Sequence, residues 1–123
     1  MCGKWHVGSA QKGSPVNPGG RGFDEWLIGL NFFDNEPYLS RMGVVEQIKG
    51  SGSAITIDAT IDFLNKHKDG GKPMFAVAWF PSPHSPHSEK PPADPEMYAG
   101  QDGGPYFSEI TVLDTQFGRL RRE

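Results

Sequence analysis

The clearest hydrophobic pattern lies in the middle of the chain, where apolar side chains recur at the spacing of one helical face. These positions are Ala54, Ile57, Ile61 and Leu64. Ser53 directly precedes these residues as a candidate N-cap, and Asp62 and Lys66 have the spacing of a helical ion pair. Gly70 and Gly71 end the pattern, as C-terminal glycines do. The spacing therefore predicts an amphipathic helix that begins near Ser53 and ends before Gly70.

A continuous apolar run, residues 74–80, follows this helix after Pro73. The run does not alternate with polar residues, which is typical of a strand buried on both faces. A helix followed by such a strand is half of a β-α-β unit, so the pattern predicts the α/β fold class. The strand stops at residues 81–87, where the sequence PSPHSPH predicts a stiff loop.

A second amphipathic helix is predicted from about Tyr106, because Pro105 fits its first position and arginines follow near its end. Its predicted buried face consists of Ile110, Leu113, Phe117 and Leu120. Residues 23–30 form a short apolar element near the start of the chain. The other segments are predicted to be loops or linkers: residues 1–23, 31–52, 50–53 and 88–105.

These elements do not make a complete sheet. A single strand with two apolar faces needs neighbouring strands, and the last helix reaches Glu123 without a C-cap. We therefore expect residues 1–123 to be an internal part of one larger α/β domain, truncated at both ends and without a second domain.

Composition narrows the possible classes of protein. The 123 residues include 16 Gly and 11 Pro with a hydrophobic share of 36%, which excludes a coiled coil, a collagen and a helical bundle. A net charge of −3 without a basic stripe argues against nucleic-acid binding. The absence of a long apolar run argues against a membrane span, and one cysteine excludes an internal disulfide. No signal peptide follows Met1, and the compartment is left open.

Two groups of residues are candidates for chemistry. His84 follows the predicted strand in a proline-stiffened loop, where an imidazole can donate to an oxyanion or transfer a proton. The alternative is an exposed histidine without a role. Lys4 and His6 lie among glycines that allow a ligand to approach, and a lysine suits sulfate or phosphate. The alternative there is a flexible terminus.

Other polar and aromatic residues favour structural roles. No metal-binding spacing links Cys2, His6, His84 and His87, so we expect no metal site and a buried Cys2. We expect His67 to be solvated or to touch helix-end carbonyls. The tryptophans are predicted to lie in the core: Trp5, Trp26 and Trp79. The loop carboxylates are predicted to be solvated: Asp24, Glu25, Asp34 and Glu36.

Taken together, the motifs resemble the sulfatases of the alkaline phosphatase-like superfamily. Residues 3–8 (GKWHVG) look like the family's G-K-W-H-x-G, and residues 21–26 (RGFDEW) resemble the segment that follows it. Residues 72–86 are similar to the K-P-F-F strand that ends in P-x-P-H-x-P. Residues 106–120 match the family's Y…L-D…G-R-L helix. The resemblance covers the whole chain and implies a three-layer fold around a mixed, largely parallel sheet.

The resemblance also implies roles for the candidate residues. Lys4 would contact the sulfate oxygens, and His6 would hydrogen-bond the hydroxyl of a formylglycine hydrate, the family's nucleophile. His84 would bind the sulfate and assist the leaving group. Cationic and imidazole donors around a developing oxyanion suit ester cleavage, so these roles agree with the chemistry of the residues. His87 has no family role and is kept only as a residue at the rim of the site.

Several parts of a sulfatase site are missing from this sequence. The nucleophile arises from Cys or Ser in C-x-P-x-R, a motif that the chain lacks, and Cys2 does not begin one. The family's calcium is held by an upstream Asp pair and a downstream D-N segment, and neither lies in this chain. A second active-site lysine of the family also lies downstream, outside this chain. We therefore expect the parent protein to hydrolyse sulfate esters and this chain alone to be inactive.

Two alternatives remain. A phosphoester or phosphonate hydrolase of the same superfamily would use similar residues, because sulfate and phosphate are both tetrahedral. A non-catalytic anion- or glycan-binding module could have kept only half of the site. The expected partner is a small-molecule or glycan sulfate ester, and the sequences of residues 31–52 and 86–105 do not identify it further.

Overall fold

The structure, a computed structural model, describes residues 1–32, 35–87 and 96–123. Its strands are β1 (Cys2–Lys4), β2 (Leu27–Gly29), β3 (Tyr38–Arg41), β4 (Val44–Gln47) and β5 (Ala78–Trp79). Its helices are the short 3₁₀ helix η1 (Gly19–Arg21) and the α-helices α1 (Gly52–His67) and α2 (Gly104–Leu120). Asp34 and the first part of the predicted loop 88–105 lie outside the described residues.

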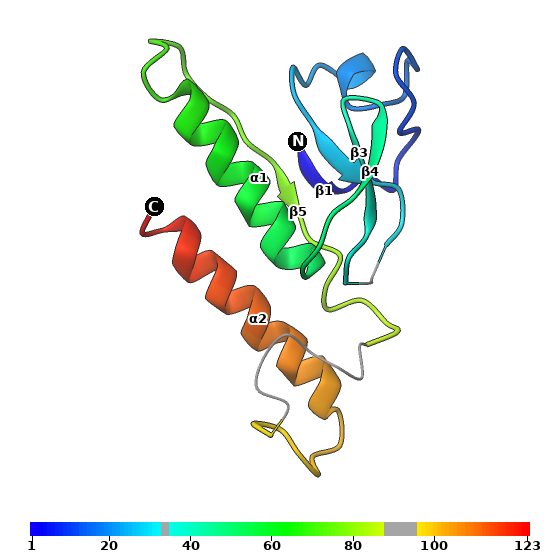
Figure 1. Cartoon of the computed structure of the whole chain (residues 1–123), viewed down its shortest axis with the longest axis vertical. Helices are drawn as coiled ribbons and strands as arrows, with labels where there is room; N and C mark the ends of the chain where they lie inside the picture. Colours follow the sequence, from blue (N-terminus) through cyan, green and yellow to red (C-terminus); the bar gives the residue numbers. More distant parts are fainter. Residues whose placement is uncertain (33–34, 88–95) are drawn as a thin grey trace.

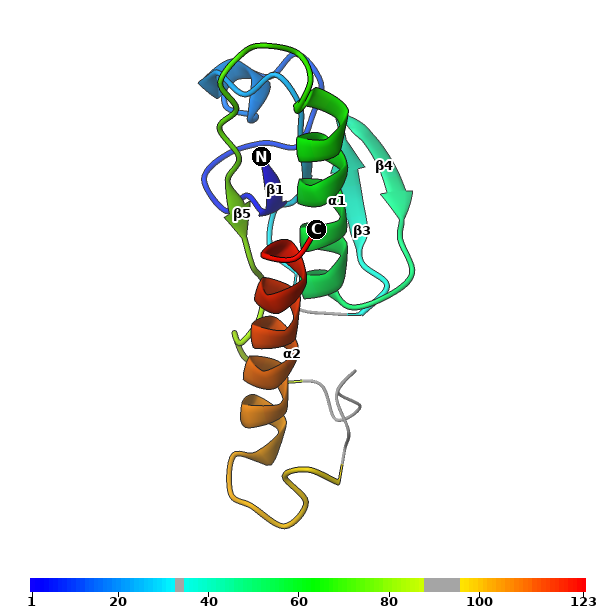
Figure 2. The ribbon, with the colours of Figure 1, turned by 90° about the vertical axis from the view of Figure 1, so that its left-hand side faces the viewer.

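The strands form one mixed sheet in the order β4-β3-β2-β1-β5. β1 runs parallel to both β2 and β5, whereas β2–β3 and β3–β4 are antiparallel pairs. α1 packs on β1 and β5, and α2 packs on α1. Figures 1 and 2 show both helices on the same side of the sheet, with α2 extending past one edge. The predicted α/β class with a mixed sheet is confirmed, and the described chain supplies two of its layers.

Two segments predicted to be loops contain strands. β1 lies within residues 1–23, and β3 and β4 form a hairpin within residues 31–52. The hairpin turns through Met42 and Gly43, whose φ angles are 53° and 93°. Tight two-residue hairpin turns need positive φ and usually carry Asn-Gly or Asp-Gly, so Met42 gives no recognisable turn signal. β1 has only three residues, too few for an alternation of apolar and polar side chains to indicate a strand.

α1 begins earlier than predicted. Its N-cap is Ser51, whose Oγ accepts a hydrogen bond from the Ala54 N–H at 3.2 Å. Ser53 is therefore a buried residue of the first turn, and residues 50–53 are a helix start rather than a linker. The predicted Asp62–Lys66 pair is also wrong, because Lys66 Nζ lies 2.8 Å from Glu25 Oε1.

β5 is shorter and more exposed than the predicted strand at residues 74–80. Only Ala78 and Trp79 pair in the sheet, and they pair with β1 alone in the described chain. Met74 and Phe75 are exposed, and 46% of Trp79 is accessible. Burial on both faces is therefore wrong for this chain, because β5 is an edge strand here.

α2 buries a different face from the predicted one. Ile110 and Phe117 are 39% and 45% exposed, whereas Ser108, Val112 and Gln116 are buried. These three residues recur every fourth position and form one stripe along the helix. α2 packs on α1, and its most apolar face stays partly accessible in the described chain.

The core has a cluster of side chains on each face of the sheet. Leu27 of β2 packs with Phe32, Leu39 and Ile55, on the side of α1. The next residue, Ile28, packs with Met1, Trp5 and Trp26. Successive strand residues point to opposite faces, which explains this division. Trp5, Trp26 and Cys2 are buried as predicted, but Trp79 is not.

Candidate functional site

The parallel pairing of β1 and β5 brings the predicted site residues to one edge of the sheet. Cys2 pairs with Ala78 and Gly3 with Trp79, so Lys4, the last residue of β1, lies level with the end of β5. His6 lies two residues beyond β1, and His84 lies in the loop after β5. The carboxyl ends of neighbouring parallel strands meet at the same edge, where ligands bind in open α/β sheets.

Trp5 fixes the backbone between Lys4, the last residue of β1, and His6. Its ring is 4% exposed and stacks on Trp79, with 5.8 Å between ring centroids. Its indole N–H donates to the Val16 carbonyl at 3.1 Å, and its backbone N–H donates to the Gly29 carbonyl at 2.6 Å. With Trp5 held in the core, Lys4 is half-buried and His6 is exposed.

His84 sits on a turn immediately after β5. Its backbone N–H donates to the Pro81 carbonyl at 3.2 Å, and its side chain is exposed. Nδ1 lies 2.5 Å from the Ser85 carbonyl oxygen. A carbonyl only accepts, so Nδ1 carries the hydrogen, and Nε2 of the neutral ring has the lone pair. An imidazole fixed in this way can exchange a proton with a ligand through Nε2.

His87 does not lie free at the rim of the site but packs against α2. Its Nδ1 lies 3.6 Å from Oε2 of Glu109, a side chain that is only 6% exposed. Its ring meets the ring of Tyr106 edge-on, with 5.3 Å between centroids. Sequence reasoning missed this contact because nothing in the local pattern joins the loop to the helix.

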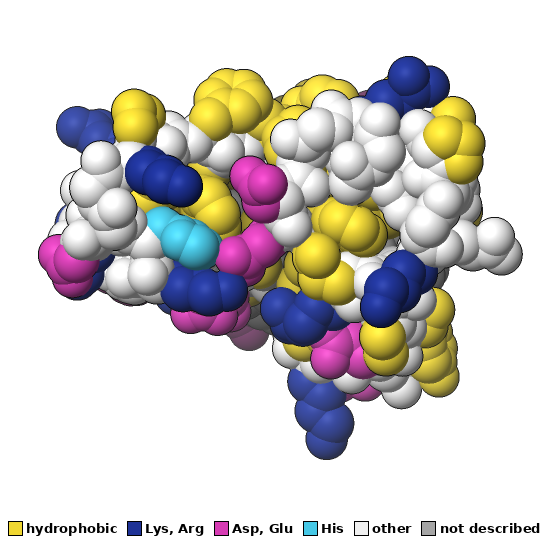
Figure 3. All heavy atoms as spheres, turned by 90° about the horizontal axis from the view of Figure 1, so that it is seen from above, with side chains coloured by type: hydrophobic (Ala, Val, Ile, Leu, Met, Phe, Trp, Pro, Cys, Tyr) yellow, Lys and Arg dark blue, Asp and Glu magenta, His cyan; other side chains and the backbone are white. Residues whose placement is uncertain are grey.

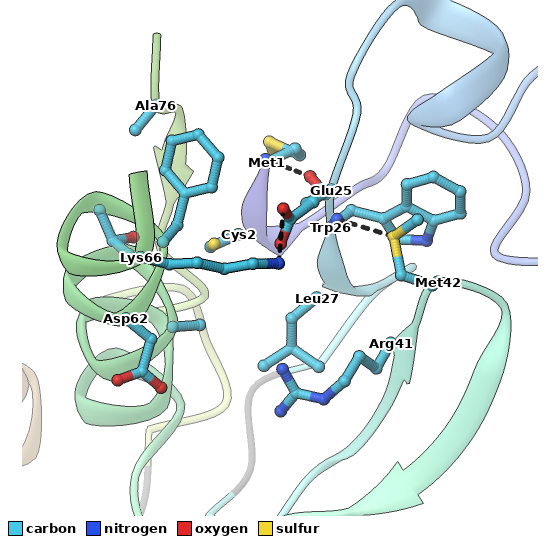
Figure 4. A pocket seen from close by; sticks show the side chains of 13 residues that line it. Met1, Cys2, Glu25, Trp26, Leu27, Arg41, Met42, Asp62, Lys66 and Ala76 are labelled. Carbon is cyan, nitrogen blue, oxygen red and sulfur yellow. Dashed lines mark hydrogen bonds and ion pairs between the residues drawn. The ribbon is translucent and has the colours of Figure 1, made fainter. Parts of the chain in front are cut away.

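Two hollows lie away from the carboxyl ends of β1 and β5, near the other end of the sheet. An apolar pocket of about 300 Å³ is lined by residues of β1, β2 and α1, among them Cys2, Leu27 and Phe63 (Figure 4). A neighbouring hollow of about 550 Å³ extends toward residues 70–75. Figure 3 shows this face, with hydrophobic surface between charged side chains. Neither hollow is lined by Lys4, His6 or His84, so both are separate from the candidate site.

The sequence predicts that Glu25 is solvated and that His67 is solvated or touches helix-end carbonyls, but the two side chains contact each other instead. Glu25 Oε1 lies 2.8 Å from Lys66 Nζ and 2.7 Å from His67 Nε2, which joins the start of β2 to the end of α1. The hydrogen bonds from Lys66 and then from His67 lower the pKa of the Glu25 carboxyl, and desolvation opposes them weakly. The partners are more than 40 residues from Glu25, so no sequence spacing could have indicated them.

The described residues contain no group of three or more His, Cys, Asp or Glu side chains that could hold a metal ion. Cys2, His6, His84 and His87 are thus not assembled into a site. The described residues therefore offer no ligand set for a calcium ion of the kind that the family resemblance implies. Among the described helices, none is long and apolar enough to cross a bilayer.

Solved structures share this fold. The crystal structure of Ps i-CgsB in complex with k-i-k-neocarrahexaose superposes with a TM-score of 0.78 at 21% sequence identity. A second crystal structure, of Ps i-CgsB, gives a TM-score of 0.77 at 20% identity. The match covers 97% of this chain and 32% of the neocarrahexaose-bound chain, so this chain spans about a third of that protein.

No curated protein matches the chain, but a family model does. The model of the sulfatase family matches residues 1–121, which is nearly the whole chain and includes both edge segments that carry Lys4 and His84. Sequence and fold agree, and this chain belongs to the sulfatase family.

Proposed function

We propose that this chain supplies the sulfate-contacting half of the active site of a sulfuric ester hydrolase. One observation carries the proposal: β1 and β5 are parallel neighbours, and Lys4, His6 and His84 all follow from their carboxyl ends. Membership of the sulfatase family supports the reaction class. The fold supports a larger parent protein, because the chain spans 32% of a structural neighbour.

Each residue has a role that suits its chemistry. The Lys4 ammonium neutralises charge on the sulfate oxygens as the ester S–O bond breaks. His84 donates or accepts a proton through Nε2, because Nδ1 is held by the Ser85 carbonyl. His6, exposed two residues beyond β1, would hydrogen-bond the hydroxyl of a formylglycine nucleophile. That nucleophile must come from outside this sequence, which contains neither C-x-P-x-R nor S-x-P-x-R.

A sulfated glycan is the substrate class that we propose. The support is the structural neighbour, which was solved with a neocarrahexaose, an oligosaccharide of a sulfated glycan. The exposed position of the His84 loop is compatible with an extended ligand. At 21% identity the neighbour supports the fold, so the choice of glycan is open to experiment.

The test is sulfate release by the full product of the gene that encodes this chain. We expect it to hydrolyse 4-nitrophenyl sulfate or a neocarrageenan oligosaccharide. Lys4→Ala and His84→Ala should each lower kcat/KM by about 10²-fold or more, as the loss of an oxyanion contact does. Asp114→Asn, an exposed carboxylate on α2, is the control and should have no effect.

The same assay separates the alternatives. Faster release of phosphate from 4-nitrophenyl phosphate would favour a phosphoester hydrolase, and full activity of both active-site variants would refute the assigned roles. The 123-residue chain by itself should show no turnover, and turnover by it would contradict the need for an external nucleophile. Saturable binding of a sulfated glycan without turnover by the full product would favour a binding module.

A further inference from the structure

The loop that carries His84 is attached to α2 at both of its ends. Phe80, just before the loop, lies with its ring centroid 5.2 Å from that of Phe117. His87, at the far end, lies 5.3 Å from Tyr106 by the same measure. His84 lies between these two attachments and is exposed, as are Ser85 and Pro86. The path of the loop is therefore set by α2 as well as by β5.

The attachment at His87 has a charged component. Glu109 is 5% exposed as a residue, and a buried carboxylate is costly unless a partner compensates it. His87 Nδ1 lies 3.6 Å from Glu109 Oε2, just beyond hydrogen-bond length, and the nitrogen is itself buried. Tyr106 and Glu109 are three residues apart on α2, so they lie on one face of the helix, and the imidazole packs against both.

α2 is also connected to β1 through α1. Arg119 Nη2 of α2 lies 2.9 Å from Asp58 Oδ1 of α1, and α1 packs directly on β1. Lys4 is the last residue of β1. Contacts thus link β1, the strand that ends at Lys4, to α1, α1 to α2, and α2 to His87, which lies three residues from His84.

We propose that His87 is a positioning residue. By packing against Glu109 and Tyr106 of α2, it holds His84 at the end of the sheet where Lys4 lies. This inference rests on the proposed function, because it assumes that His84 and Lys4 meet one sulfate group. It does not place His87 in contact with the substrate. It explains why a second histidine follows the loop although the family resemblance gives it no role.

The first measurement concerns the order of the His84 backbone in the 123-residue chain. We expect an NMR order parameter near 0.85 in the unmodified chain, as in rigid backbone, and a fall below roughly 0.6 in His87→Ala. His87→Gln, whose amide can donate to Glu109, should retain most of the order. Asp114→Asn, on the same helix, is the matched control and should change nothing. An unchanged order parameter in His87→Ala would overturn the proposal.

The second measurement is the affinity for inorganic sulfate, read from the shift of the His84 ring signal at constant ionic strength. His87→Ala should weaken binding by about three- to tenfold, and His87→Gln by less. Glu109→Gln should weaken it too, and the double variant should be no weaker than His87→Ala. Fully additive losses would refute a joint action of the two residues.

The two measurements separate this inference from the proposed function. Loss of His84 order in His87→Ala, combined with no sulfate binding by the unmodified chain, would support the positioning role and count against the sulfate site. Sulfate binding that is unchanged in His87→Ala would support the sulfate site and count against the positioning role. If His87→Ala does not fold, Glu109→Gln carries the test, and an unchanged order of His84 in that variant would overturn the inference.

Discussion

At the residue scale, the surroundings of Gly3 show why the position before Lys4 requires a glycine. Its φ is 99°, and a Cβ at this position would lie 1.9 Å from the Trp79 carbonyl oxygen of β5. β1 and β5 could not keep their spacing around such an atom. The glycine that begins the GKWH segment is therefore a condition for bringing Lys4 next to β5.

Gly3→Ala should destabilise the chain strongly, because it combines a backbone clash with an unfavourable φ. We expect a loss of about 2–4 kcal/mol in the free energy of unfolding, measured by urea denaturation. Gly13→Ala is the matched control, since Gly13 also has a positive φ, 78°, but a Cβ added there would meet no described atom within 4 Å. Equal losses in the two variants would mean that φ alone matters and that the contact with β5 does not.

Glu25 makes the stability of the chain depend on acid pH. Its pKa is lowered by Lys66 and His67, so the folded carboxyl releases its proton at a lower pH than the unfolded one. The stabilisation is present above the ordinary value of 4.5 and is lost as the pH falls through the lowered pKa of the folded state. Because the side chain is 37% exposed, we expect less than about 1 kcal/mol.

Thermal unfolding between pH 3 and pH 6 tests this dependence. Glu25→Gln should lower Tm slightly at pH 6 and reduce the fall in Tm toward pH 3. Asp24→Asn, an exposed neighbour, should follow the unmodified chain. A Glu25→Gln profile parallel to that of the unmodified chain would show that other carboxylates cause the acid sensitivity.

The candidate site could be predicted in part because two of its signals are local. A lysine and a histidine after glycine, and a histidine after an apolar run and prolines, are visible in the order of the residues. Other contacts of the described chain are not local. Glu25 meets His67 across 42 residues, and His87 meets Glu109 through packing alone. Such pairs depend on how the helices lie on the sheet, which no short pattern encodes.

At the scale of elements, the start of α1 shows how two nearby serines can be confused. Both Ser51 and Ser53 precede the apolar stripe, but only Ser51 has extended backbone angles and an Oγ that accepts from the Ala54 N–H. Ser53 lies inside the first turn with its Oγ buried and unsatisfied by hydrogen bonds in the described chain. The two residues therefore make opposite contributions to helix stability.

Ser51→Ala should cost about 1 kcal/mol of unfolding free energy, as the loss of an N-cap usually does. Ser53→Ala removes a buried hydroxyl that gains nothing from a partner, so it should be neutral or slightly stabilising. Both values come from urea denaturation of the same chain. A larger loss for Ser53→Ala than for Ser51→Ala would restore Ser53 as the cap.

The hairpin that sequence reasoning missed and the misassigned face of α2 have different causes. β3 and β4 bury little on the sheet face, since Leu39 and Ser40 are the only buried residues of the hairpin strands, so alternation is weak. α2 has a clear apolar face, but the residues buried along the helix include Ser108, Val112 and Gln116 instead. A hydrophobic period predicts that an element exists, whereas the neighbours present decide which face is buried.

For the molecule as a whole, much apolar surface and one sheet edge remain accessible in the described chain. Tyr38, Val44 and Val45 of the β3–β4 hairpin are each more than 65% exposed, and β4 is the outermost strand of its sheet edge. An exposed edge strand with β-branched side chains can pair with another copy of itself. The chain spans 32% of its structural neighbour, which agrees with surfaces that are not covered within it.

We therefore expect the 123-residue chain to self-associate through β4 as its concentration rises, measured by light scattering after size exclusion. Val45→Lys should reduce this association, because a lysine on an edge strand disfavours pairing of two edges. Val7→Lys is the matched control: Val7 is 62% exposed, lies in a loop, and takes the same change of net charge, from −3 to −2. If both variants reduce association equally, charge or general hydrophobicity is the cause. If only Val45→Lys does so, the edge of β4 carries the contact, and covering that edge is a requirement that the remainder of a longer sulfatase would have to meet.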